Sequence, residues 1–158
     1  MSNARAPGAL LDSNVLVAAL AETHQHHAES MALLVNAGSN RFCVAAHSYA
    51  EAFTTLTRQG GAAPFRRGPE EVVRALHSVA AATRLIGLTP AQTLEAVGSF
   101  AAAGGIGARI YDWLIGQAAV MAGVGAIITW NTGHMRSLFP RFIVLTPAEY
   151  AERPPVIG

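Results

Sequence analysis

Residues 9–17 have the sequence ALLDSNVLV, and this stretch indicates the fold class. The apolar run at residues 9–11 is typical of a short strand that is buried on both faces. Asp12 ends the run, and residues 12–14 favour a turn into an apolar helical run at residues 15–21. A buried strand that passes directly into a helix is expected in a parallel sheet, where helices connect successive strands.

The same alternation continues along the chain. Further strands are predicted at residues 41–46, 84–88, 126–130 and 142–145, and further helices at residues 26–36, 48–58, 70–82, from 89 onward, at 109–122 and after 146. Gly38 is a helix-stop signal, and residues 89–92 (TPAQ) have the spacing of a capping box with proline at the first helical position. Continuous apolar strands that alternate with helices predict a parallel sheet covered by helices on both faces.

The bulk properties are those of one globular domain. The chain has 158 residues and is 51% hydrophobic, yet no apolar run approaches the ~18 residues that a membrane helix needs. We expect a tag or disordered segment at residues 1–7, a single domain at 8–152 and a tail at 153–158. The single Cys43 excludes an internal disulfide and, with no secretory signal, predicts a cytoplasmic protein.

The charge pattern does not identify a partner. Charged residues make up 13% of the chain, about half of the ~25% found in ordinary globular proteins. All eleven basic residues are arginine, which suits phosphate contact but is also what the codon bias of a GC-rich genome produces. No block of like charge marks a nucleic-acid-binding face.

Four oxygen-bearing side chains follow or flank the predicted strands in a way that suggests a metal site. The chain has only two aspartates, and Asp12 directly follows the first strand, as Asn131 follows the fourth. Glu51 lies early in the helix after the second strand, and Asp112 lies early in the helix that leads to the fourth. Because the carboxyl ends of parallel strands meet at one edge of a sheet, these groups are candidates for one site. Mg²⁺ and Mn²⁺ prefer such oxygen ligands.

Each of these residues also has a simpler explanation. Asp12 fits a helix N-cap, and Glu51 fits a capping box with Ser48, which is the favoured interpretation when Glu51 is taken alone. Asp112 fits a surface position near a helix N-terminus, and Asn131 fits a turn. Only the joint placement of the four residues favours the metal site.

At this point the chain resembles a known family, the PIN-domain ribonucleases, and within it the VapC-type toxins of bacterial toxin–antitoxin pairs. The resemblance covers residues 9–150 and rests on four motifs in order and on the closing residues. The motifs are LLDSNVL at 10–16, AAHSYAE at 45–51, IYDWLI at 110–115 and IITWNTGHM at 127–135, and the closing residues are VLTP at 144–147. The chain departs from the family pattern at Ser13, where threonine is usual, at Tyr111, where histidine is common, and at Asn131, where many members carry aspartate.

The resemblance implies a three-layer α/β/α PIN-like domain with a mainly parallel sheet of four to five strands. It implies an endoribonuclease that depends on Mg²⁺ or Mn²⁺, acts on RNA, forms a homodimer and is inhibited by a small antitoxin. The catalytic set would be Asp12, Glu51, Asp112 and Asn131, with Asp12, Asp112 and Glu51 as metal ligands. Supporting residues would be Ser13, Asn14 and Thr129. Since Asn131 is neutral, one-metal catalysis, or a second ion recruited only with substrate, is expected rather than a preloaded pair of ions.

The histidines, the tryptophans and a group of arginines each allow more than one interpretation. His24, His26 and His27 lack the partners of a structural zinc site, and His47, His77 and His134 are scattered, so a polar helix entrance is favoured. For the two tryptophans, Trp113 and Trp130, core packing is expected rather than stacking on bases. The arginines at 58, 66, 67 and 74 suit contact with RNA phosphates or with the acidic groups of an antitoxin, and a solvated loop is the equal alternative. The RNA-binding candidates are Arg58, Arg66 and Arg67.

Two other function classes compete with the nuclease. A catalytically weak PIN-like domain that binds RNA or a protein partner is the alternative, and the neutral Asn131 is the feature that supports it. A phosphotransferase with Asp12 as nucleophile is set aside, because Asn14 occupies the place of the second aspartate and the chain contains no lysine.

Overall fold

The structure is a computed structural model that describes residues 8–36 and 41–153. Within these residues it has five strands, which are β1 (Ala9–Leu11), β2 (Phe42–Ala45), β3 (Arg84–Ile86), β4 (Ala126–Ile128) and β5 (Ile143–Leu145). The helices are α1 (Ser13–Leu20), α2 (His27–Asn36), α3 (Ala46–Thr57), α4 (Pro69–Ala82), α5 (Pro90–Ala102), α6 (Ile110–Ala122), α7 (Thr132–Leu138) and α8 (Pro147–Ala151), with a 3-10 turn, η1 (Gly107–Arg109), before α6.

All five strands are parallel, and their order in the sheet is β3-β2-β1-β4-β5. From β1 the chain moves outward through β2 to β3 and then returns to place β4 on the other side of β1. The point where the direction of winding reverses therefore lies between β1 and β4. In open α/β sheets this is where functional crevices form, beyond the carboxyl ends of the strands.

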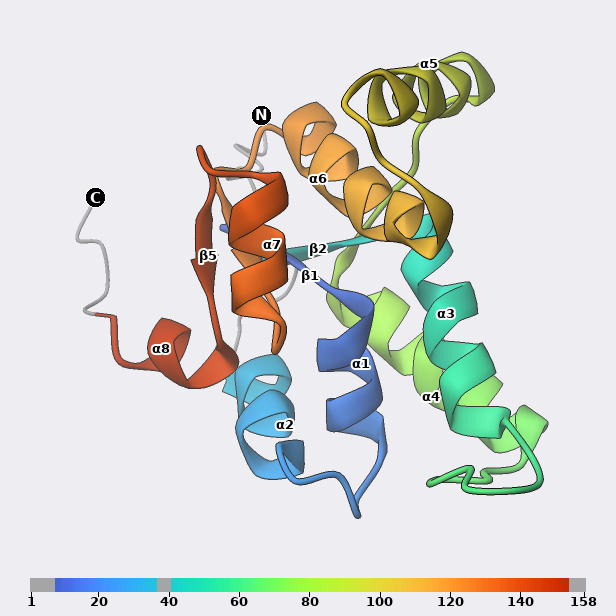
Figure 1. The fold of residues 1–158 in the computed structure, drawn as a ribbon. Coiled ribbons are helices and arrows are strands. Elements are labelled where there is room, and N and C mark those ends of the chain that lie inside the picture. The colour runs from blue at the N-terminus through green and yellow to red at the C-terminus, as the bar shows by residue number, and fades with distance from the viewer. Residues whose placement is uncertain (1–7, 37–40, 154–158) are drawn as a thin grey trace.

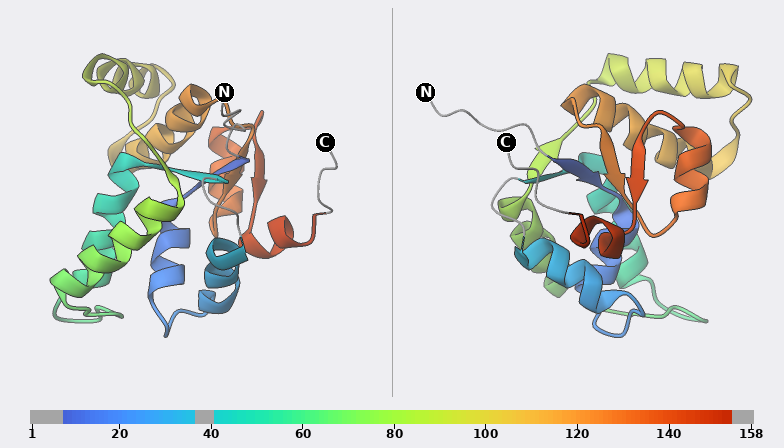
Figure 2. Two further views of the ribbon diagram at one scale, coloured as in Figure 1. Left: turned by 180° about the vertical axis from the view of Figure 1, so that it is seen from behind. Right: turned by 90° about the vertical axis from the view of Figure 1, so that its left-hand side faces the viewer.

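Helices cover both faces of the sheet, which confirms the predicted three-layer α/β/α fold (Figures 1 and 2). Because side chains alternate along a strand, Leu11 of β1 faces one layer and Leu10 faces the other. The first layer contains α1, α2, α3 and α4, whose buried residues include Leu16, Leu56 and Val72. The second contains α6 and α7, with α5 packed on the outer side of α6.

The predicted elements are present, with two differences. The helix α7 was not predicted, because its seven residues (TGHMRSL) follow a turn signal and include a glycine. The helix α3 begins at Ala46 and its N-cap is Ala45, whose methyl group cannot accept a hydrogen bond. The predicted capping box between Ser48 and Glu51 is therefore wrong, and Ser48 instead lies inside the helix, fully buried.

Two further predictions fall partly outside the described residues. Gly38 lies there, and so do residues 1–7 and 154–158, so the domain limits at 8 and 152 stay predictions. Among the helices that the structure does describe, none has both the length and the apolar character needed to cross a membrane.

Candidate active site

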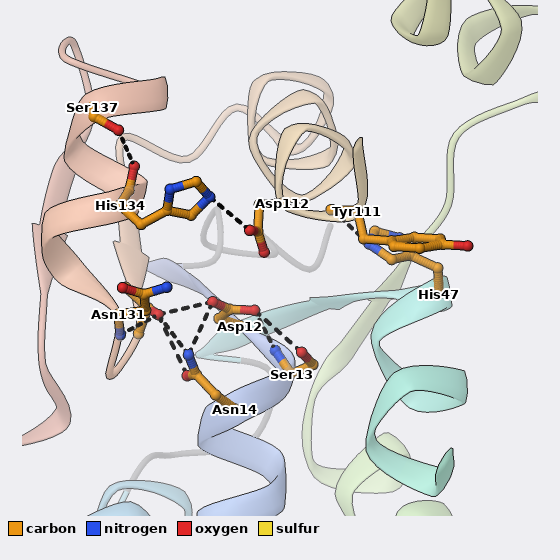
Figure 3. Close-up of polar contacts among 10 residues, drawn as sticks. Asp12, Ser13, Asn14, His47, Tyr111, Asp112, Asn131, His134 and Ser137 are labelled. Carbon is orange, nitrogen blue, oxygen red and sulfur yellow. Dashed lines mark hydrogen bonds and ion pairs between the residues drawn. The ribbon is translucent and has the colours of Figure 1, made fainter. Parts of the chain in front are cut away.

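The four oxygen-bearing residues come from four elements around the reversal point between β1 and β4. Asp12 is the residue between β1 and α1, and Asn131 is the N-cap of α7, three residues beyond the end of β4. Glu51 lies in the second turn of α3, and Asp112 is the third residue of α6. Figure 3 shows Asp112 from α6 above Asp12, with His134 and Asn131 on the α7 side.

Asp12 is the most buried carboxylate of the set, with 4% of its surface exposed. Oδ1 accepts from the backbone N–H of Ser13 at 2.7 Å and lies 3.4 Å from the Ser13 hydroxyl. Oδ2 accepts from the hydroxyl of Thr129 at 2.8 Å and from the amide of Asn14 at 3.3 Å. Burial raises the pKa of Asp12, the Thr129 hydrogen bond opposes this shift, and the negative charge of Asp112 adds to it.

Asn14 and Thr129 join the beginning of α1 to the segment after β4. Nδ2 of Asn14 donates to Oγ1 of Thr129 at 3.0 Å, while Oδ1 of Asn14 accepts from the backbone N–H of Trp130 at 3.1 Å. This pairing determines which way the amide points, because only Nδ2 can donate and only Oδ1 can accept. Ser13, Asn14 and Thr129 therefore all contact Asp12 or hold its neighbours, as expected of supporting residues.

Glu51 is available to the site because it does not cap α3. Its side chain is one-third exposed, and Oε1 lies 3.6 Å from Nε2 of His47, one helical turn earlier. Burial, followed by the charges of Asp12 and Asp112, raises the pKa of Glu51 to about 7. The charges of Asp12 and Asp112 thus act on Glu51, although each of the three carboxylates belongs to a different element.

Two histidines that the sequence analysis treated as scattered lie beside the carboxylates. Nε2 of His134, in α7, is 2.8 Å from Oδ2 of Asp112 (Figure 3). His47 contacts Glu51, and its Nε2 also lies 3.2 Å from the backbone carbonyl of Tyr111, the residue before Asp112. The i, i+4 spacing of His47 and Glu51 was a usable signal, because such residues share a helix face. His134 gave no such signal, since α7 was not predicted.

Asn131 borders this network through its backbone. Its N–H donates to Oγ1 of Thr129 at 3.0 Å, so Asn131 is one hydrogen bond away from the residue that holds Asp12 (Figure 3). Its side chain is exposed, and among the contacts of the described residues none uses it to cap α7. The side chain is free to face a ligand at the rim.

The residues present fit a hard divalent cation by the chemistry of their donors. Three carboxylates and an amide oxygen are the ligands that Mg²⁺ and Mn²⁺ prefer, and a cation would offset the repulsion that raises the pKa of Glu51. Within residues 8–36 and 41–153, no three histidine, cysteine or acidic side chains already lie close enough to form a complete metal site. Asp12, Glu51 and Asp112 would therefore need to draw together around an ion.

The arginines predicted to bind RNA are not brought to the carboxylates. The loop that carries Arg66 and Arg67 lies beyond the C-terminal end of α3 (Figure 1), and Glu51 lies six residues before that end, about 9 Å along the helix axis. Arg66 donates to the carbonyls of Ala63 and Gly61 in its own loop, and Arg67 contacts the carbonyl of Leu20 and the carboxylate of Glu71. Arg58, the C-cap of α3, is exposed.

The two tryptophans pack against the core as predicted, and His24 and His26 lie at the entrance to α2. The ring of His26 stacks on Trp130 with centroids 3.8 Å apart, and Nε1 of Trp130 donates to Ser30 at 2.9 Å. His24 stacks on Phe65, at 5.9 Å between ring centroids. Trp113 packs against the second layer of the core.

Comparisons with known proteins agree with this geometry. A family model described as PIN domain matches residues 9–136, whereas no curated protein matches the sequence significantly. Among solved structures, the toxin VapC20 of Mycobacterium tuberculosis aligns with a TM-score of 0.65 at 14% identity, over 81% of this chain and 93% of that one.

Two further structures show the same fold. VapBC2 of Rickettsia felis aligns with a TM-score of 0.57 at 17% identity, over 85% of this chain and 95% of that one. FitAcB of Neisseria gonorrhoeae aligns with a TM-score of 0.59 at 20% identity, over 88% and 97% of the two chains. At these identities the structures establish similarity of fold alone, and the family model covers most of the chain. This protein belongs to the PIN domain family.

Proposed function

We propose that this protein is a divalent-metal-dependent endoribonuclease and the toxin of a toxin–antitoxin pair. The observation that carries the proposal is the placement of Asp12, which is 4% exposed, together with Asp112 and Glu51 around the point where the sheet reverses its winding. Structural ion pairs do not need three carboxylates of like charge side by side. A cation and a phosphate substrate do explain such a cluster.

In this proposal Asp12 and Asp112 hold Mg²⁺ or Mn²⁺, and Glu51 completes the ligand set or orients the attacking water. When bound, the cation polarises the phosphate and lowers the pKa of its water. Ser13, Asn14 and Thr129 hold the Asp12 carboxylate in place through the contacts described above. The pKa of Glu51 is about 7 in the metal-free protein, and the positive charge of a bound cation would lower it, so that Glu51 would meet the cation as a carboxylate.

The neutral Asn131 favours a site that loads one ion. An amide oxygen can contribute a ligand directly or through water, but it adds no negative charge to hold a second cation. This is a difference from the more common aspartate, and it makes the affinity for metal the property that limits activity.

The toxin assignment is supported by similarity of fold. VapC20 is described as a toxin that cleaves the sarcin–ricin loop, and the Rickettsia felis complex was solved with a DNA fragment from its promoter. For this chain we propose an RNA substrate, a small antitoxin whose segment lies across the acidic residues, a homodimer and a cytoplasmic location. The alanine-rich stretch at residues 100–103 offers a surface for close packing between subunits, and light scattering that shows a monomer at micromolar concentrations would contradict the dimer. Arg58, Arg66 and Arg67 remain candidates for contact with RNA remote from the scissile phosphate.

Cleavage of total RNA by the purified protein, with Mn²⁺, Mg²⁺ or EDTA, tests the activity. The matched control is Asp112→Asn, which keeps the shape of the side chain and an oxygen beside His134 but removes a ligand charge. We expect cleavage with metal by the wild type, background cleavage by the variant and the same circular dichroism spectrum for both. Equal cleavage by the two proteins would remove Asp112 from the catalytic set.

A catalytically weak PIN-like domain that binds RNA or a protein partner is the second candidate. It is favoured by the neutral Asn131 and by the contact that already joins Asp112 to His134. The same preparations distinguish it, because a binding protein would shift RNA in a gel at all metal concentrations without cutting it.

A further inference from the structure

We propose that His134 is a positioning residue of the acidic site, which holds one oxygen of Asp112 so that the other is presented to the divalent cation. The inference rests on the proposed function and adds a residue to it. Nε2 of His134 lies 2.8 Å from Oδ2 of Asp112. Figure 3 shows the other oxygen of Asp112 on the side that faces Asp12.

Asp112 needs such a support because its neighbours push it away. Figure 3 shows the carboxylate of Asp112 above that of Asp12, and two like charges facing each other repel. The Asp112 side chain is 32% exposed, so it has room to rotate toward solvent. A nitrogen within contact distance of one oxygen opposes that rotation. Ligating carboxylates are commonly held by a neighbouring group in this way.

His134 is itself held firmly by the packing of α7. Only 18% of its side chain is exposed, and the next residue, Met135, is 1% exposed in the core. At the end of α7 the ring of Phe139 rests directly against α6, at the position of Gly116. Gly116 lies one turn after Asp112 on the same face of α6, so this close approach places α7 beside Asp112.

Two variants of His134 distinguish a side chain that can still reach Asp112 from one that cannot. His134→Gln keeps a nitrogen near the position of Nε2, whereas His134→Asn carries its nitrogen too close to the backbone to reach Asp112. Both are polar and uncharged, and both keep α7 free of a new apolar group. His77→Ala is the control, because His77 is an exposed histidine on α4, away from the carboxylates.

Calorimetric titration with Mn²⁺ alone provides the measurement. We expect His134→Asn to raise the dissociation constant about 10- to 100-fold, the range found for residues that support metal ligands. His134→Gln should stay within about threefold of the wild type by the same reasoning, and His77→Ala should be unchanged. Binding by His134→Asn that equals or exceeds that of the wild type would overturn the proposal, since tighter binding would mean that His134 blocks Asp112.

A metal-free experiment tests the contact on its own. In EDTA, His134→Asn should lower the urea midpoint of the wild type more than that of Asp112→Ala, because the partner is already absent from the latter. Equal effects would overturn the proposal. A wild type that binds no Mn²⁺ would overturn the proposed function together with this inference. A wild type that binds Mn²⁺ tightly, beside a His134→Asn variant that binds equally well, would overturn the inference alone.

Discussion

A carboxylate with 4% of its surface exposed, such as Asp12, must be satisfied by its neighbours if the fold is to be stable. Hydrogen bonds from Ser13, Asn14 and Thr129 meet that need, yet burial still raises its pKa. Glu51 has fewer supports and a pKa of about 7. At the scale of single residues, the candidate site therefore contains carboxylates whose charged form is disfavoured by burial and by neighbouring negative charge.

The change Asn131→Asp is expected to tighten Mn²⁺ binding. It adds a carboxylate at the rim, where the Asn131 side chain does not cap α7 among the described contacts. RNA cleavage should rise at low Mn²⁺ and equal that of the wild type at saturating Mn²⁺. Calorimetric titration of both proteins measures the effect. Identical dissociation constants, with a change in stability well under ~1 kcal/mol, would return Asn131 to the role of a turn residue.

The change Glu51→Gln is expected to alter the pH dependence of stability. The folded-state pKa of Glu51, about 7, lies above the ordinary value of 4.5, so the folded protein binds more protons between these pH values. The contribution of Glu51 to the free energy of unfolding is therefore fully present below about pH 4.5 and is lost as the pH rises through about 7.

Glutamine has no proton to lose, so the variant should gain stability relative to the wild type as the pH rises. Because the Glu51 side chain is one-third exposed, we expect only about 1 to 2 kcal/mol between pH 5 and pH 8 after allowance for solvent screening. Urea unfolding in EDTA at the two pH values measures this difference. If the free energy of unfolding changes equally with pH in the variant and the wild type, the pKa of Glu51 is not raised in the folded protein.

At the scale of elements, the close docking of α7 against α6 depends on a missing side chain. A Cβ atom at Gly116 would lie 1.9 Å from Cζ of Phe139, a distance that no packed structure tolerates. The absence of this atom lets the Phe139 ring contact α6 directly. This in turn brings His134 within 2.8 Å of Asp112.

The change Gly116→Ala should therefore destabilise the protein, although alanine is the better helix former. The clash with Phe139 should cost about 1 to 3 kcal/mol, more than the ~1 kcal/mol that alanine gains in a helix interior. Gly98→Ala is the matched control, because Gly98 also lies inside a helix, α5, but a Cβ atom there has no neighbour within 4 Å among the described residues. Thermal unfolding should show a lower midpoint for Gly116→Ala and an equal or higher one for Gly98→Ala. Two variants that both gain stability would show that Phe139 moves aside freely.

At the scale of the whole molecule, the order of the strands assembles the site. Because β4 returns to the side of β1, Asp12 contacts Thr129 across 117 positions of sequence. Asp112 and Glu51 reach the same place on helices from the two opposite layers of the sheet. A cation bound among them would join both layers.

Mn²⁺ is therefore expected to raise the thermal midpoint of the wild type. At a concentration 100 times the dissociation constant the stabilisation is about 2.7 kcal/mol, or roughly 5 to 10 °C for a domain of this size. Asp112→Asn should show a much smaller rise under the same conditions. An equal rise in both proteins would place the ion elsewhere.

The α/β class and the parallel sheet could be predicted from the sequence, and Asp12, Asp112 and their supporting residues could be named from it as candidates for one site. These follow from local patterns, because apolar runs, turn residues and helix periodicity act over a few neighbouring positions. One local pattern gave a wrong prediction: Ser48 and Glu51 match a capping box that does not form, since α3 begins at Ala46. The short helix α7 escaped prediction because tertiary packing of Met135 and Phe139, not local propensity, stabilises it.

Which side chains meet depends on the tertiary structure. The contact of His134 with Asp112, the pKa of Glu51 and the remoteness of Arg66 and Arg67 all depend on how helices dock on the sheet. Docking is set by the fit of surfaces such as Gly116 against Phe139, which involves residues distant in sequence. No pattern within a single segment carries that information.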